Sequence, residues 1–122
     1  MLIPNYYTIL DQQIEGHSAL FRVALNSDCK VYEGHFPGSP VSPGVCNIQL
    51  ILECAGLVLG TSLRLLAVSK CKLTTLVTPH DHPEVEVRVE LSEKNDTIYA
   101  LNAAIGKGED IYLQLKAEVE KE

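Results

Sequence analysis

Residues 34–53 decide the fold of this chain and read GHFPGSPVSPGVCNIQLILE. Prolines crowd the first part of this stretch, and proline removes a backbone donor, fixes φ and disfavours helix in the residue before it. Residues 34–40 therefore cannot form a regular helix or a central strand. Ser42 and Pro43 are residue types typical of a helix N-cap and of the first helical position. We expect a rigid loop that carries one histidine, His35, and leads into a helix.

The helix that follows is predicted to be the buried centre of the fold. Apolar residues occur on nearly all its sides from Val45 to Leu59, so we expect it to be covered on most sides. Gly60 is the expected end. Glu53 and Arg64 interrupt the apolar run, which makes it a core helix and not a membrane span.

Length, charge and cysteine spacing limit the possible domain number, partners and location of the protein. A chain of 122 residues is predicted to be one domain, residues 1–122, with a core that needs no cross-links. Its formal net charge of −6 argues against nucleic acid or an anionic membrane surface as partner. The start of the chain has no basic and apolar signal pattern, and we expect a cytoplasmic protein. The cysteines lack CxxC spacing and are expected to be buried, reduced thiols without a metal: Cys29, Cys46, Cys54 and Cys71.

Strands are predicted on both sides of the helix. Residues 2–10 form a short lead-in in which Tyr7 is expected to pack, and a first strand ends before a turn at 15–17. The alternation in ALFRVAL and EVEVRVE indicates half-buried strands. A turn is expected over 91–96, and the His-Asp-His cluster at 80–82 is interpreted as a solvated turn. The predicted strands cover 19–25, 65–77, 84–90, 97–105 and 110–119, which gives an α+β fold with an antiparallel sheet wrapped around one long helix.

The loop and helix start resemble the signature of a known family. In the 3-hydroxyacyl-acyl-carrier-protein dehydratases, which have the hot-dog fold, a GHFPxxPVxPGV loop leads straight into the central helix. The rest of this chain is similar to that family in the order of its elements only. The matching residues are Gly34, His35, Phe36, Pro37, Pro40, Val41, Pro43, Gly44 and Val45.

The resemblance implies the elimination of water from a (3R)-3-hydroxyacyl thioester carried on a phosphopantetheine arm. It implies that His35 removes the α-proton and that the backbone N–H of Gly44 holds the thioester oxygen. Phe36, Pro43 and Val45 would line the substrate site. These roles make physical sense, since an ordinary histidine pKa near 6.5 suits a general base at neutral pH. The free N–H groups of a first helical turn favour developing negative charge.

The chain departs from the family at the catalytic acid. The resemblance implies that the other subunit of a dimer donates the catalytic acid. The family's acid comes fourteen residues after the histidine, and here that position is Gln49, which cannot donate a proton as a general acid. Glu53 lies four residues further on, on the same helix face. Glu53 could reach the site directly or through a water. His35 acting alone with a water relay is the other possibility.

The resemblance also implies partners. The substrate would arrive on an acyl carrier protein or coenzyme A, with no other cofactor, and two chains would pair with their helices side by side. A carrier protein is acidic, so we expect a basic patch at the tunnel mouth, with Arg64, Lys70, Lys72 and Arg88 as candidates. The expected pathway is fatty-acid or polyene-type lipid biosynthesis. The alternatives are an impaired acyl-thioester-binding subunit of a heterodimeric dehydratase and a hot-dog thioesterase.

Overall fold

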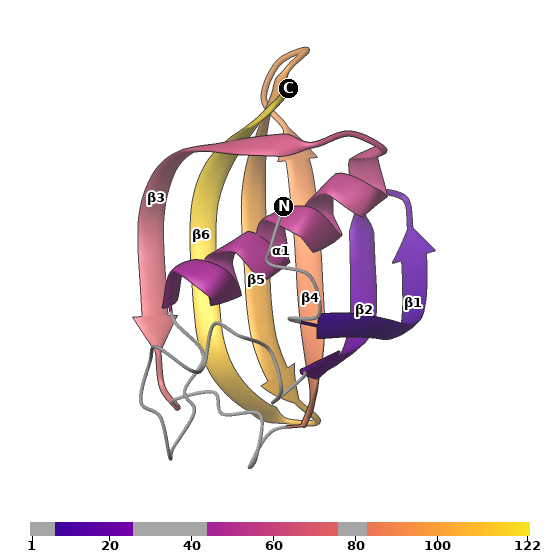
Figure 1. Ribbon diagram of the computed structural model, residues 1–122. Coiled ribbons are helices and arrows are strands. Elements are labelled where there is room, and N and C mark those ends of the chain that lie inside the picture. Colours follow the sequence, from indigo (N-terminus) through magenta and orange to yellow (C-terminus); the bar gives the residue numbers. More distant parts are fainter. Residues whose placement is uncertain (1–6, 26–43, 76–82) are drawn as a thin grey trace.

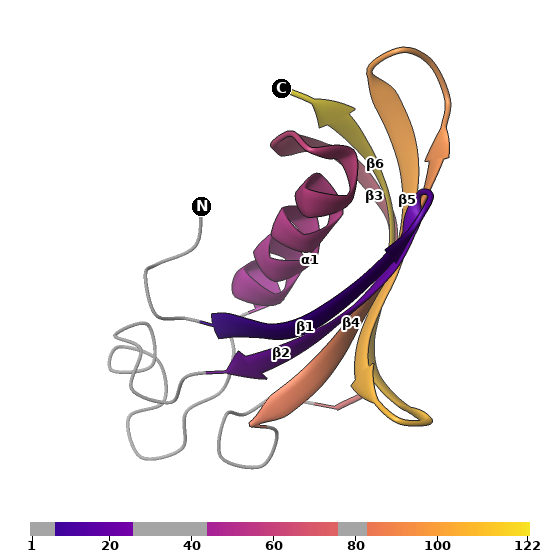
Figure 2. The same ribbon diagram turned by 90° about the vertical axis from the view of Figure 1, so that its right-hand side faces the viewer.

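A computed structural model describes residues 7–25, 44–75 and 83–122 of the chain (Figure 1). One antiparallel sheet of six strands has the order β1-β2-β4-β5-β6-β3. Figure 2 shows that the helix α1 lies against one face of this curved sheet. The predicted α+β architecture is therefore confirmed. The elements are β1 (Tyr7–Glu15), β2 (Ser18–Leu25), α1 (Gly44–Leu59), β3 (Leu63–Leu73), β4 (Glu84–Glu93), β5 (Ile98–Lys107) and β6 (Asp110–Lys121).

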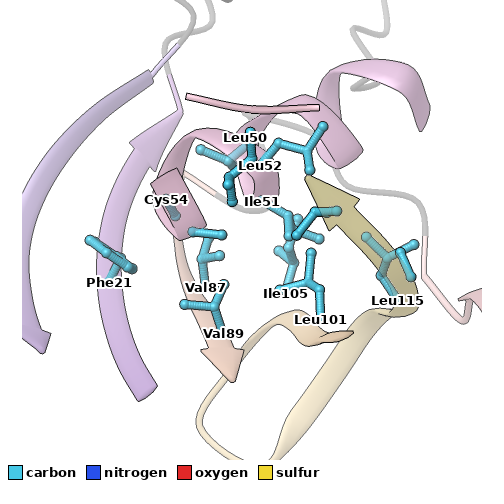
Figure 3. Packing of buried hydrophobic residues seen from close by; sticks show 14 of the residues in the cluster. Phe21, Leu50, Ile51, Leu52, Cys54, Val87, Val89, Leu101, Ile105 and Leu115 are labelled. Carbon is cyan, nitrogen blue, oxygen red and sulfur yellow. The ribbon is translucent and has the colours of Figure 1, made fainter. Parts of the chain in front are cut away.

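Alternation along the strands decides which face of the sheet meets α1. In β4, Val85, Val87 and Val89 are buried, whereas Arg88 is exposed on the opposite face. The prediction of a half-solvated strand from EVEVRVE is thus confirmed. Figure 3 shows the buried side chains of the sheet together with those of α1, among them Phe21 from β2. Burial of this apolar surface is the main force that holds α1 on the sheet.

The sheet-facing side of α1 is a single stripe. Burial recurs at the helical period in Asn47, Leu50, Ile51, Cys54 and Ala55, and Leu52 and Gly56 are buried as well. The helix was predicted to be covered on most sides, but Leu57 is 50% exposed. Leu57 follows Leu50 by seven residues and shares its side of the helix, so the prediction was wrong for this residue because full burial of α1 ends at Gly56, before the last turn.

A glycine pair ends α1 where the sequence places its end. Gly60 has φ 73°, and its N–H donates to the carbonyl of Gly56 over 2.8 Å. A side chain at Gly60 would be strained in this left-handed conformation. A Cβ on Gly56 would lie 2.7 Å from the carbonyl oxygen of Thr61, so the chain can turn back toward β3 only because Gly56 has no side chain.

Several strand boundaries differ from the prediction. β1 already begins at Tyr7, inside the predicted lead-in, and β4 continues to Glu93, inside the turn predicted over 91–96. Pairing with β2 and β5 keeps these segments extended, which local turn preferences do not reveal. β3 covers Leu63–Leu73 instead of 65–77. Residues 26–43 and 76–82, which contain the predicted loop, N-cap and His-Asp-His cluster, lie outside the described residues.

The cysteines differ from their predicted burial. Cys54 is buried in the core, but Cys71 is exposed, and both are free thiols. Cys71 lies on β3, an edge strand of the described sheet. The prediction of a buried thiol was wrong there because an apolar run on an edge strand is not necessarily covered. The side chains of Cys29 and Cys46 are not among those described. Within the described segments, α1 is too short to cross a membrane.

Candidate functional site

A hydrogen-bonded group on α1 is centred on the carboxylate of Glu53. The Tyr7 hydroxyl donates to Oε1 of Glu53 over 2.7 Å. Nε2 of Gln49, one helical turn earlier, donates to Oε2 over 3.2 Å. All three side chains are half-buried. The two helix residues that the sequence singled out therefore contact each other directly, as their spacing predicts.

Tyr7 reaches Glu53 because β1 is irregular. The register between β1 and β2 shifts between Ile9 and Asp11, and Figure 1 shows β1 bending there so that its first residues lie below the middle of α1. Bulges of this kind bend a strand and re-aim its side chains. The sequence analysis gave Tyr7 only a packing role. No local signal could have revealed the contact, because it depends on a register shift between two strands.

Burial and the charge of Glu53 act on both neighbouring acids. The pKa of Tyr7 is raised well above its ordinary value, first by burial and then by the hydrogen bond to Glu53 and its charge. Tyr7 therefore keeps its proton and serves as a donor to Glu53. Burial, with a smaller contribution from Glu53, raises the pKa of Cys54 to about 12. Cys54 remains a thiol at neutral pH and is not a nucleophile.

Tyr7 and Gln49 are residue types that can hydrogen-bond either form of a carboxyl group. A tyrosine hydroxyl can donate or accept a hydrogen bond, and a glutamine amide presents a donor group and an acceptor oxygen. Tyr7 and Gln49 can thus hydrogen-bond Glu53 in its ionised and in its neutral form.

The start of α1 supplies the second part of the site. α1 begins at Gly44, so the N–H groups of its first turn have no partner within the helix and carry the positive end of its dipole. Gly44 thus has the place in the helix that the resemblance requires. Of the other predicted site residues, His35, Phe36 and Pro43 lie outside the described residues. Val45 is in α1, but its side chain is not described.

Comparison with known proteins identifies the family. Residues 11–112 match the ApeI-like family, described as ApeI dehydratase. The chain belongs to this family. The dehydratase is 28% identical over 117 residues to the 3-hydroxyacyl-acyl-carrier-protein dehydratase FabZ of Lactiplantibacillus plantarum, with 86% of this chain and 80% of that protein covered. It is 30% identical over 106 residues to the FabZ of Lactobacillus helveticus, with 77% and 72% covered. The prediction of a dehydratase-like hydro-lyase is therefore confirmed by the family.

Solved structures confirm the hot-dog fold of the dehydratase. The dehydratase heterocomplex ApeI:P from Xenorhabdus doucetiae is similar with a TM-score of 0.73 and 18% identity, covering 93% of this chain and 97% of that chain. A hypothetical thioesterase from Streptococcus pneumoniae, solved with coenzyme A, is similar with a TM-score of 0.67 and 9% identity, covering 95% and 85%. At these identities the likeness concerns the fold alone.

The predicted basic residues of the dehydratase lie mostly away from the Glu53 group. Lys70 and Arg88 line a groove of about 950 Å³. Arg88 is in register with Leu20 and Ala104, on the sheet face opposite α1. Arg64 forms an ion pair with Glu120 on the neighbouring strand. The groove is therefore separated by the sheet from the helix that carries Gln49 and Glu53.

Proposed function

We propose that this dehydratase eliminates water from 3-hydroxyacyl thioesters carried by an acyl carrier protein or coenzyme A, with His35 as base and Glu53 as acid. The hydrogen bonds of Tyr7 and Gln49 to Glu53 support this proposal most directly. The named activity of the FabZ relatives supports the substrate class. We assign the enzyme to fatty-acid or polyene-type lipid biosynthesis in the cytoplasm, with no cofactor beyond the phosphopantetheine of the substrate.

The proposed reaction has two proton movements. His35 takes the proton from C2 of the acyl group, and the electron pair of that bond moves toward the thioester oxygen, which the N–H of Gly44 holds. The C3–O bond then breaks as the C2–C3 double bond forms. A neutral Glu53 gives its proton to the departing oxygen, which leaves as water. The reaction consumes one hydroxyacyl thioester and yields one enoyl thioester and one water.

Gln49 has a defined part in this scheme although it cannot act as an acid. Its Nε2 atom donates to Glu53, which leaves Oε1 of the same amide to accept a hydrogen bond from the C3 hydroxyl. The carboxyl group of Glu53 lies one helical turn beyond the acid position of the family pattern, and the Gln49 amide between them would contact both Glu53 and the hydroxyl. Glu53 reaches the hydroxyl directly or through a single water held by Gln49.

The proposed assembly is a homodimer that pairs along β3. This strand is an edge of the sheet formed by the described residues, and an unpaired edge is a template for another strand. Leu66 and Val68 on β3 are 40% and 43% exposed, which a second chain would cover. Leu57 on α1 is exposed as well, in accord with a second helix beside the first. The ApeI:P heterocomplex makes a heterodimer the main alternative.

The proposal is tested by an assay of enoyl-thioester formation and hydration with 3-hydroxyacyl groups on acyl carrier protein. We expect the wild type to turn over and both His35→Ala and Glu53→Gln to abolish activity. Glu90→Gln, the same change at an exposed position of β4, is the matched control and should keep full activity. A silent wild type that Gln49→Glu activates would refute the acid role of Glu53. The chain would then be a binding subunit that has lost its acid.

A further inference from the structure

Asn47 is an unusual residue in the buried stripe of α1. It is 2% exposed and is the buried polar side chain of the described core, among apolar residues such as Leu50 and Ile51. Among residues 7–25, 44–75 and 83–122, its amide group has no hydrogen-bond partner. A buried amide without a partner is costly, and native proteins keep few of them. This cost calls for a ligand group that satisfies the amide.

The place of Asn47 on the helix indicates which ligand group that is. Asn47 comes three residues after Gly44, the first residue of α1, so the two lie next to each other on one side of the helix. A helical Cα–Cβ bond tilts toward the helix N-terminus, and the side chain therefore covers the turn before its own Cα. Helical geometry therefore directs the Asn47 side chain toward the first turn, whose N–H groups have no partner within the helix.

We infer that Nδ2 of Asn47 is a second donor, beside the N–H of Gly44, to the oxygen of the bound thioester. This inference rests on the proposed function. When His35 takes the C2 proton, negative charge moves onto the thioester oxygen, and two donors in a water-free site stabilise it more than one does. The described residues of the free protein offer the buried amide no partner, and the bound thioester oxygen would supply one. Asn47 thereby differs from Gln49, which acts on the departing hydroxyl.

The substitution Asn47→Leu separates this role from a structural one, because leucine has a similar size but no polar atoms. The free protein should become more stable, with Tm raised by about 4 °C, since an unpaired buried amide is removed. The kcat for dehydration should fall by about 100-fold with KM changed little, as for loss of one oxyanion donor. Asn102→Leu, the same change at an exposed position of β5, should change neither value. A lower Tm, or an unchanged kcat, would overturn the inference.

A partial reaction separates this inference from the proposed function. A saturated acyl-pantetheine has no 3-hydroxyl, yet the enzyme should exchange its C2 protons for deuterium from D₂O, and Asn47→Leu should slow this exchange by the same factor. Exchange without dehydration in the wild type, slowed by Asn47→Leu, would refute the proposed dehydration but keep the inference. Normal dehydration and exchange in Asn47→Leu would refute the inference alone. A wild type that neither exchanges nor dehydrates would refute both.

Discussion

Replacing Tyr7 by phenylalanine tests whether the first strand holds Glu53 in place. The substitution keeps the ring and removes only the hydroxyl that donates to Glu53 over 2.7 Å. Hydrogen bonds to charged groups contribute about 1.5–3 kcal/mol, and the half-buried position of both partners favours the lower end. We expect a loss of about 1.5 kcal/mol in the free energy of unfolding, or roughly 6 °C in Tm for a domain of this size. The kcat should fall about tenfold at nearly constant KM, since Glu53 loses its orientation.

The assay is a double-mutant cycle measured by urea unfolding. It combines Tyr7→Phe with Glu53→Ala, and the coupling energy should be about 1.5 kcal/mol. Tyr99→Phe is the matched control, because the Tyr99 hydroxyl lies 3.4 Å from Oε2 of Glu93 and forms a weak hydrogen bond. It should cost less than about 0.5 kcal/mol and leave kcat unchanged. A coupling below about 0.3 kcal/mol between Tyr7 and Glu53 would refute the reasoning.

Two further predictions concern pH and assembly. Burial raises the pKa of Cys54 from 9.0 to about 12, so the folded protein favours the neutral thiol. The contribution of this thiol to the free energy of unfolding is complete below pH 9 and is lost as pH rises toward 12. In urea unfolding, the free energy of unfolding should fall above pH 9, with at most about 1.4 kcal/mol per pH unit due to Cys54. The fall should be less steep in Cys54→Ala. Parallel plots of unfolding free energy against pH for the two proteins would contradict this prediction. For the edge strand, Val68→Lys should convert the dimer to a monomer in analytical ultracentrifugation, whereas Ile111→Lys, at an apolar residue of β6 that is also exposed, should not. An unchanged mass of Val68→Lys would exclude pairing along β3.

The sequence predicts the architecture well because its main elements follow simple periodicities. The alternation of EVEVRVE places Val85, Val87 and Val89 on the buried face, as observed. The glycine signal at Gly60 marks the end of α1, where the left-handed conformation is found. Strand ends were less well predicted, since pairing with neighbouring strands extends β4 through residues that locally favour a turn.

The candidate site was predicted only where it depends on spacing along one helix. Gln49 and Glu53 are four residues apart, and their contact follows from helical geometry. Tyr7 was missed because its position depends on the shifted register between β1 and β2. Asn47 was missed for another reason. One polar residue in an apolar stripe is ordinary in a sequence and becomes informative only when its burial and its missing partner within the described residues are known.

The bend in β1 also links the integrity of the site to the weakest part of the sheet. β1 is an edge strand, paired with β2 alone in the described sheet, and the ends of edge strands open locally at a small fraction of the global unfolding free energy. Tyr7 is the first residue of this strand, so local opening there would break its hydrogen bond to Glu53 while the core stays folded. A ligand that binds Glu53 in the assembled site would in turn stabilise the paired form of β1, because binding to one state favours that state. Amide hydrogen exchange at the start of β1 is therefore a measure of how many molecules carry an assembled site at any moment.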